Sequence, residues 1–273
     1  MAAARGRARA EVRKRPLAVI TGASAGIGRE FARQFAAGKH DLVIVARRRE
    51  RLVELKRELE HEHGVRVRVQ IADLFDPEGP ATLYAALRRQ APDVLVLNAG
   101  TLEVGSFLEV DLDRAMQMVD LNVVALVKLA RLFLPGMVAR GRGRLLNVAS
   151  IAAFQPVPDM AVYAATKSFV LSLSESLCEE LRGTGVTVTA VCPGLTESEM
   201  ADAVIARRPA LQRVRKLLFG DTAAVAREGY AACMRGDPVV ITGVPNRVVE
   251  ALVGLQPRWV RRRLAGAALR LAR

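Results

Sequence analysis

Thr21-Gly-Ala-Ser-Ala-Gly-Ile-Gly28 is a glycine-rich turn between a short apolar run, residues 17–21, and an amphipathic stretch, residues 26–38. The run is typical of a buried strand and the stretch of a helix. Gly22 permits a tight turn, and Gly26 and Gly28 let a pyrophosphate approach the helix N-terminus. No Lys-Ser/Thr pair follows the last glycine, so the turn is not a P-loop. It predicts a nucleotide site, with a plain tight turn as the alternative.

Apolar runs and helical stretches alternate along the rest of the chain. Strands are expected at 17–21, 41–46, 65–71, 93–97, 144–149, 186–192 and 239–242, and helices at 26–38, 48–63, 77–90, 112–140, 160–182 and 222–234. Such alternation is typical of parallel strands joined by crossover helices. We therefore expect an α/β fold, a single doubly wound domain over residues 16–244, with about seven parallel strands and helices on both faces. Ligands bind such sheets at the carboxyl ends of the strands.

The composition excludes several classes of protein. The chain has 273 residues, of which 51% are hydrophobic and 25% charged, as in a globular domain. Its cysteines, Cys178, Cys192 and Cys233, are odd in number and widely spaced, which excludes a disulfide scaffold and a Cys-x-x-Cys zinc site. With three histidines, no metal site is expected. The cysteine usage suits a reducing compartment, so a cytoplasmic location is expected.

The net charge of +13 is concentrated at the two ends of the chain. Residues 1–15 carry a net charge of +5 and residues 246–273 carry +6, so the body between them is nearly neutral. A nucleic-acid partner is not expected, because the body has no basic stripe and aromatic residues make up only 4% of the chain. Residues 1–15 are predicted to be a basic disordered arm. No apolar run reaches the length of a transmembrane helix, since Lys128 and Arg131 interrupt the longest candidate, residues 121–138.

The end of the second predicted strand indicates which dinucleotide is bound. It reads Val45-Ala-Arg-Arg-Arg49, where a site that prefers NAD places an acid against the ribose 2′-hydroxyl. Guanidinium groups suit a 2′-phosphate instead. The pattern therefore predicts NADP(H) as the cofactor, with Arg47 as the principal contact. The alternative is that these arginines are the solvated start of a helix.

Tyr163-Ala-Ala-Thr-Lys167 places a tyrosine and a lysine on one face of a predicted helix. Ser150 stands at the end of the preceding strand, and Asn122 lies in the long helix one crossover earlier. A tyrosine with a pKa of about 10 is a poor acid–base group at neutrality, and a nearby ammonium lowers that pKa. A serine hydroxyl can polarise a carbonyl. The set predicts proton transfer to a carbonyl oxygen, although a Tyr-x-x-x-Lys pair alone is usually a surface feature.

Taken in order, these motifs resemble the short-chain dehydrogenase/reductase family over residues 16–243. The glycine turn resembles the family's cofactor motif, and Asn98-Ala-Gly100 resembles its sheet-stabilising motif beside the adenine. Asp73 matches the carboxylate placed against the adenine. Pro193-Gly194 followed by Thr196 resembles the loop over the nicotinamide, at a looser spacing. The resemblance implies a Rossmann-type domain and a homo-oligomer, either a dimer or a tetramer.

The resemblance also implies roles for individual residues. Tyr163 would be the proton donor in reduction, and Lys167 would hold the nicotinamide ribose and tune Tyr163. Ser150 would steady the substrate oxygen, and Asn122 would anchor a water of the proton relay. Cofactor contacts are expected at Gly22, Ser24, Gly26, Ile27, Gly28, Arg47, Asp73, Leu74, Asn98, Ala99, Gly100, Tyr163, Lys167, Pro193, Gly194 and Thr196.

The implied activity is hydride transfer between NADP(H) and a small-molecule carbonyl or alcohol. A catalytically idle NADP-binding sensor or scaffold is the alternative, although it would not need Ser150, Tyr163 and Lys167 together. Nucleotide-sugar epimerases share the Tyr-x-x-x-Lys pattern, but they space their glycines differently.

The substrate and the tail are less constrained by the sequence. Residues 195–219 are predicted to form a helical lid that mixes apolar residues with arginines, which suits a lipophilic substrate such as an acyl chain, a steroid or a long aldehyde. Residues 245–273 form a basic amphipathic tail, with Trp259 and Leu264 at helical spacing opposite Arg261–Arg263. The tail could lie on an anionic membrane surface or pack on the domain or on a second subunit.

Overall fold

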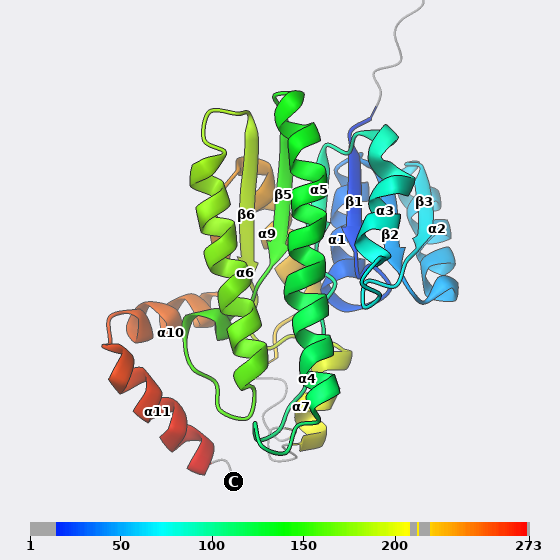
Figure 1. Ribbon diagram of the computed structural model, residues 1–273. Helices are drawn as coiled ribbons and strands as arrows, with labels where there is room; N and C mark the ends of the chain where they lie inside the picture. Colours follow the sequence, from blue (N-terminus) through cyan, green and yellow to red (C-terminus); the bar gives the residue numbers. More distant parts are fainter. Residues whose placement is uncertain (1–14, 208–211, 213–218, 272–273) are drawn as a thin grey trace, which may run out of the picture.

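The computed structural model of the chain describes residues 15–207, 212 and 219–271 (Figure 1). Within these ranges, seven parallel strands form one sheet in the order β3-β2-β1-β4-β5-β6-β7. The strands are β1 (Leu17–Thr21), β2 (Asp41–Ala46), β3 (Val67–Ile71), β4 (Val94–Leu97), β5 (Gly143–Val148), β6 (Val186–Cys192) and β7 (Val239–Ile241). The predicted doubly wound parallel sheet is confirmed. The chain order reverses between β1 and β4, and ligands bind at such a switch point.

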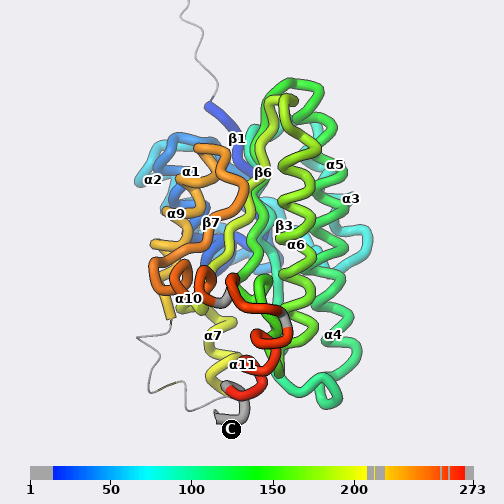
Figure 2. The backbone as a smooth tube through the Cα atoms, turned by 90° about the vertical axis from the view of Figure 1, so that its left-hand side faces the viewer, coloured from blue at the N-terminus to red at the C-terminus, as the bar shows by residue number. Residues whose placement is uncertain are grey.

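Helices cover both faces of the sheet. The α-helices of the described residues are α1 (Gly26–Ala37), α2 (Arg49–His63), α3 (Gly79–Leu87), α4 (Leu112–Val119), α5 (Ala125–Ala139), α6 (Ala161–Glu180), α7 (Glu199–Arg207), α9 (Thr222–Arg235), α10 (Val244–Gly254) and α11 (Arg258–Leu271). Figure 2 shows α1, α2 and α9 on one side of the sheet and α3, α5 and α6 on the other. Three short helices complete the path: 3-10 turns at Arg88–Gln90 (η1) and Ile151–Phe154 (η3), and a π-helix at Asp120–Val124 (η2).

The strands are buried on both faces, because successive side chains alternate between two cores. Val19 and Leu95 pack into the core beneath α3, α5 and α6. Ile20 and Val96 pack into the core beneath α1, α2 and α9. All four side chains are at most 1% exposed. This two-sided burial explains why the strands read in the sequence as continuous apolar runs.

The long helical stretch predicted at 112–140 is interrupted. A π-helix, Asp120–Val124, separates α4 from α5. By length and composition, residues 112–139 could cross a membrane. In the fold, however, α5 packs Leu129, Phe133 and Met137 against the sheet, so its apolar character serves the core. The other predicted elements begin and end within two residues of the observed ones, when the 3-10 turn η1 is counted with α3.

The predicted lid begins at a narrow neck. Thr196 pairs with Gly220 across a β-bridge, and the amide of Gly220 donates to the carbonyl of Leu195 at 2.8 Å. Helix α7 follows Thr196 along the chain. Four of the basic residues predicted for the lid, Arg208, Arg213, Arg215 and Lys216, lie outside the described residues.

The sequence predicts a separate segment at each end of the chain. The predicted arm, residues 1–15, lies outside the described residues except for Arg15, which donates to the carbonyl of Gly64. The predicted tail, residues 245–273, contains two helices, and the first of them, α10, begins one residue before the predicted boundary. The tail leaves the end of β7 and places α11 beside the carboxyl edge of the sheet (Figures 1 and 2).

Candidate active site

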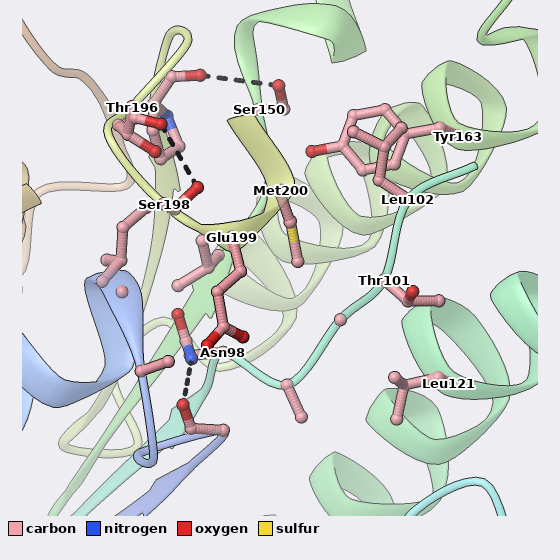
Figure 3. Close-up of a pocket in the computed structure, with 18 of the residues that line it drawn as sticks. Asn98, Thr101, Leu102, Leu121, Ser150, Tyr163, Thr196, Ser198, Glu199 and Met200 are labelled. Atoms are coloured by element: carbon pink, nitrogen blue, oxygen red, sulfur yellow. Dashed lines mark hydrogen bonds between the residues drawn. The ribbon is translucent and has the colours of Figure 1, made fainter. Parts of the chain in front are cut away.

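A pocket of about 690 Å³ opens at the carboxyl ends of the strands. It extends from the glycine turn and the end of β2 to Ser150, Tyr163 and the lid. Figure 3 shows Tyr163, Leu102 and Thr101 on one side of the pocket and Thr196 and Ser198 on the other. Of the residues predicted for the site, Gly28 and Asn122 do not line the pocket, and the remainder do.

The glycine turn is held open by Asn98, which follows β4. The Nδ2 of Asn98 donates to the carbonyl oxygens of Thr21 at 3.0 Å and Gly22 at 3.3 Å. Gly22 has a φ of +68°, and a Cβ there would lie 2.7 Å from this Nδ2. A Cβ at Gly28 would lie 2.3 Å from the carbonyl oxygen of Gly22, so Gly28 acts from behind the pocket wall. The cradle fits a pyrophosphate, because it leaves the start of α1 accessible to an anion.

Arg47 and Arg48 both reach the pocket from the end of β2, in different directions. The guanidinium of Arg47 lies over the ring of Phe75 at 4.7 Å and 3.9 Å from an Asp73 carboxylate oxygen. Arg48 donates through Nε and Nη2 to the hydroxyl of Ser24 in the glycine turn, at 3.2 and 3.1 Å. The sequence predicted Arg47 as the principal contact of the 2′-phosphate and no role for Arg48. The run of adjacent arginines was the signal that could have indicated a second cation. Two positive groups beside the turn fit a 2′-phosphate.

The hydroxyl groups of Tyr163 and Ser150 point toward each other in the pocket (Figure 3). The Ser150 hydroxyl accepts from the amide of Ala152 at 3.1 Å and lies 3.5 Å from the carbonyl oxygen of Pro193. Burial raises the pKa of the Tyr163 phenol, and a hydrogen bond with Ser150 opposes that increase. The phenol is therefore protonated at neutral pH and can donate a proton.

Lys167 lies beneath Tyr163, as the i, i+4 spacing predicts. Its ammonium is 5.8 Å from the centre of the Tyr163 ring and donates to the carbonyl oxygen of Val148 at 2.8 Å. Burial lowers the pKa of Lys167 to about 8. We expected this ammonium to lower the pKa of Tyr163. That expectation is wrong, because burial is the largest influence on Tyr163 and raises its pKa.

Asn122 sits behind the pocket, within the π-helix. Its Oδ1 accepts from the amide of Thr101 at 2.9 Å, and its Nδ2 donates to the carbonyl of Thr101 at 3.0 Å and to the hydroxyl of Thr166 at 3.2 Å. A Cβ on Gly100 would lie 3.1 Å from Asn122 Oδ1 and 3.6 Å from Lys167 Nζ, so both side chains converge on this glycine. Such π-helical turns are frequent at functional sites. Thr166 was missed by sequence reasoning.

The loop after β6 closes the pocket on the side of the lid. The carbonyl of Pro193 accepts from the amide of Ile151 at 2.9 Å, which ties this loop to the end of β5. A Cβ on Gly194 would lie 2.4 Å from Asn246 at the start of α10, so the tail packs directly on the loop. Much of the wall near Tyr163 is apolar, with contributions from Leu102, Val157, Met160, Met200, Val204 and Phe219.

Comparison with known proteins agrees with this geometry. A family model described as short chain dehydrogenase matches residues 16–209. The chain is 35% identical over 219 residues to sulfoacetaldehyde reductase 2 of Chromohalobacter salexigens, covering 79% of this chain and 85% of that protein. It is 33% identical over 251 residues to a very-long-chain 3-oxoacyl-CoA reductase of Rattus norvegicus, covering 89% and 76%. Among solved structures, a short-chain dehydrogenase from Sphingobium yanoikuyae in complex with NADPH superposes with a TM-score of 0.76 and 33% identity, over 94% of each chain.

Proposed function

The chain belongs to the short-chain dehydrogenase family, and from this premise we propose that it is an NADP(H)-dependent reductase of lipophilic carbonyl compounds, able to run in reverse on secondary alcohols. The observation that carries the proposal is the meeting of Ser150, Tyr163 and Lys167 at one end of a pocket whose other end is a glycine turn flanked by arginines. NADP(H) supplies the hydride chemistry when bound, and the chain positions the reactants.

The proton chemistry follows from the environment of each side chain. We propose that the Tyr163 phenol, which is protonated at neutral pH, donates a proton to the carbonyl oxygen in reduction. The Ser150 hydroxyl is fixed by the Ala152 amide and holds the same oxygen. Lys167 holds the nicotinamide ribose and contributes positive charge beneath Tyr163. Asn122, fixed by three hydrogen bonds, orders the water that returns a proton to the site.

The cofactor contacts proposed for the pocket are those predicted from the sequence except Gly28, which lies behind the pocket wall. Gly22, and Gly26 at the start of α1, would hold the pyrophosphate, and Asp73 and Ala99 would border the adenine. Arg47 binds the 2′-phosphate, and Arg48 adds a second guanidinium next to Ser24. The loop of Pro193, Gly194 and Thr196 would border the nicotinamide.

The apolar wall supports a lipophilic substrate. Leu102, Met160 and Met200 border the space next to Tyr163, where a substrate carbonyl would lie. An acyl chain, a steroid-like ketone or a long aldehyde could lose most of its apolar surface there, which favours binding by roughly 25 cal/mol per Å². A sugar would leave polar groups unpaired against the same wall.

A panel of ketosteroids, 3-oxoacyl thioesters, long aldehydes and sugars, followed by NADPH absorbance, tests both the reaction and the substrate class. We expect turnover of at least one lipophilic member and little turnover of sugars. Tight NADPH binding without turnover of any member would favour the alternative, an idle sensor or scaffold of the same fold. Failure to bind NADPH at all would contradict both.

We propose that the protein is a homo-oligomer, either a dimer or a tetramer, because an apolar surface is exposed on α4 and on the loop before it. Phe107, Leu108, Leu112 and Met116 are between 50% and 91% exposed. A second copy of the chain would cover them. Light scattering on the purified protein measures the oligomeric state. A monomer at micromolar concentration would contradict the proposed homo-oligomer.

The tail carries a second exposed surface, and we propose that it contacts an anionic membrane from the cytoplasmic side. Along α10, α11 and the turn between them, four apolar side chains are between 57% and 83% exposed: Leu252, Leu255, Trp259 and Leu264. Arginines on the same helices supply positive charge toward lipid headgroups. Arg261 donates to the carbonyl of Phe154 at 3.2 Å, which ties α11 to the domain near the pocket.

A further inference from the structure

The arginines beside the proposed cofactor site already have a carboxylate partner, which comes from the lid. Glu199 is the first residue of α7, and the Nη1 of Arg48 donates to both of its carboxylate oxygens at 2.9 and 2.8 Å. Arg51, one turn further along α2, also donates to Glu199. These two guanidinium groups lower the pKa of Glu199, so its carboxylate is charged at neutral pH.

The Glu199 carboxylate lies inside the pocket wall, next to the place where a 2′-phosphate would bind. Ser24, Arg47, Arg48 and Glu199 all line the same cavity. In Figure 3 the side chain of Glu199 enters the pocket between Ser198 and Met200. The lid approaches the turn closely here, since a Cβ on Gly26 would lie 3.6 Å from Ser198 Cβ.

We propose that Glu199 is an internal competitor of the cofactor's 2′-phosphate: it neutralises Arg48 and Arg51 and thereby sets how strongly the site prefers NADP(H) over NAD(H). The inference rests on the proposed function, because it assumes that a dinucleotide lies along this pocket. A 2′-phosphate carries about two negative charges at neutral pH, so it attracts Arg48 and repels Glu199. A 2′-hydroxyl has no such conflict and can donate a hydrogen bond to a carboxylate at this place.

The exposure of the three side chains makes the competition reversible. The side chains of Arg48, Arg51 and Glu199 are 40%, 48% and 56% exposed. Solvent-exposed ion pairs of this kind are weak, so a phosphate can displace the carboxylate. Because Glu199 begins α7, its displacement also frees the first turn of the lid from the end of β2.

Glu199→Gln tests the competition directly, with NADPH and NADH as the probes and cofactor fluorescence or calorimetry as the readout. The substitution removes the charge and keeps the size of the side chain. We expect the variant to bind NADPH roughly three- to tenfold more tightly, the size expected of one or two exposed ion pairs, with NADH binding unchanged or weaker. Glu50→Gln is the matched control, since it removes an equal charge from the first turn of α2, where Glu50 is exposed.

The outcomes separate this inference from the proposed function. A rise in the NADPH-to-NADH affinity ratio in Glu199→Gln, with no change in Glu50→Gln, supports the competition. An unchanged ratio, or an equal change in both variants, overturns it while NADPH binding by the natural protein still stands. If neither the natural protein nor Glu199→Gln binds NADPH, both the competition and the proposed function fail.

Discussion

The ammonium of Lys167 lies 5.8 Å from the centre of the Tyr163 ring and donates its hydrogen bond to the carbonyl of Val148. The lysine is thus anchored to the end of β5 and presents its charge beneath the phenol. Because burial raises the pKa of Tyr163, the phenol is protonated at neutral pH. The protonated phenol is the form that carbonyl reduction requires.

Tyr163→Phe should lower the rate of carbonyl reduction by roughly a hundredfold to ten-thousandfold, the usual contribution of a general acid. The ring and its packing are retained, so NADPH binding should change by less than about twofold. Steady-state rates and cofactor fluorescence measure the two effects. Substantial activity in the variant would refute the role of the phenol.

Lys167→Met should abolish activity and stabilise the fold. The pKa of Lys167 is lowered to about 8 from 10.5, so the unfolded chain binds this proton more strongly than the folded one. Below pH 8 the buried ammonium costs about 3 kcal/mol, at about 1.4 kcal/mol per pKa unit, and the cost disappears as the pH rises from 8 to 10.5.

Thermal unfolding of the natural protein and Lys167→Met checks this expectation. At pH 7 the variant should unfold roughly 5 °C higher, and the difference should shrink toward pH 10. A lower unfolding temperature in the variant at pH 7 would mean that the Val148 hydrogen bond outweighs the cost of burying the charge.

Arg47→Gln should weaken NADPH binding by about tenfold or more and leave NADH binding nearly unchanged, because only NADPH offers a phosphate to the guanidinium. Arg48→Gln should also weaken the binding of NADPH and not that of NADH, but by a smaller factor. The reason is that Glu199 already neutralises part of the charge on Arg48. Titration of each variant with both cofactors measures the ratio. NADH binding as tight as NADPH binding in the natural protein would contradict the assignment of NADP(H).

Thr166→Ala should lower kcat by about tenfold, the value of one lost hydrogen bond, with little change in KM. Thr166 does not line the pocket, but its hydroxyl accepts from Asn122 Nδ2 and donates to the Tyr163 carbonyl. It therefore acts as a positioning residue. Thr166→Ser retains the hydroxyl and should restore most of the rate, whereas equal loss in both variants would indicate a packing effect.

Flotation with vesicles that contain phosphatidylglycerol tests the tail surface. The natural protein should float with these vesicles, and the double substitution Arg262→Glu/Arg263→Glu should abolish flotation, because it places negative charge on the exposed side of α11. Arg88→Glu/Arg89→Glu, at exposed positions after α3, is the control and should float normally. Absence of the natural protein from the vesicle fraction would favour packing of the tail on protein.

The sequence by itself determined the sheet and most of the pocket wall. The glycine turn, the apolar runs and the i, i+4 spacing of Tyr163 and Lys167 are local patterns, and in a parallel sheet they can only meet at the carboxyl ends of the strands. The resemblance to the short-chain dehydrogenase/reductase family placed Pro193, Gly194 and Thr196 at the site, and all three line the pocket.

Only the tertiary structure decided three further features. Arg48 and Glu199 are 151 residues apart, and nothing in the local sequence of either predicts their pairing. The π-helical turn that aims Asn122 at Thr101 packs against α6, where the hydroxyl of Thr166 accepts a hydrogen bond from Asn122. The direction of the Tyr163 pKa shift depends on how burial balances against nearby charge, and burial exists only once the pocket walls have come together.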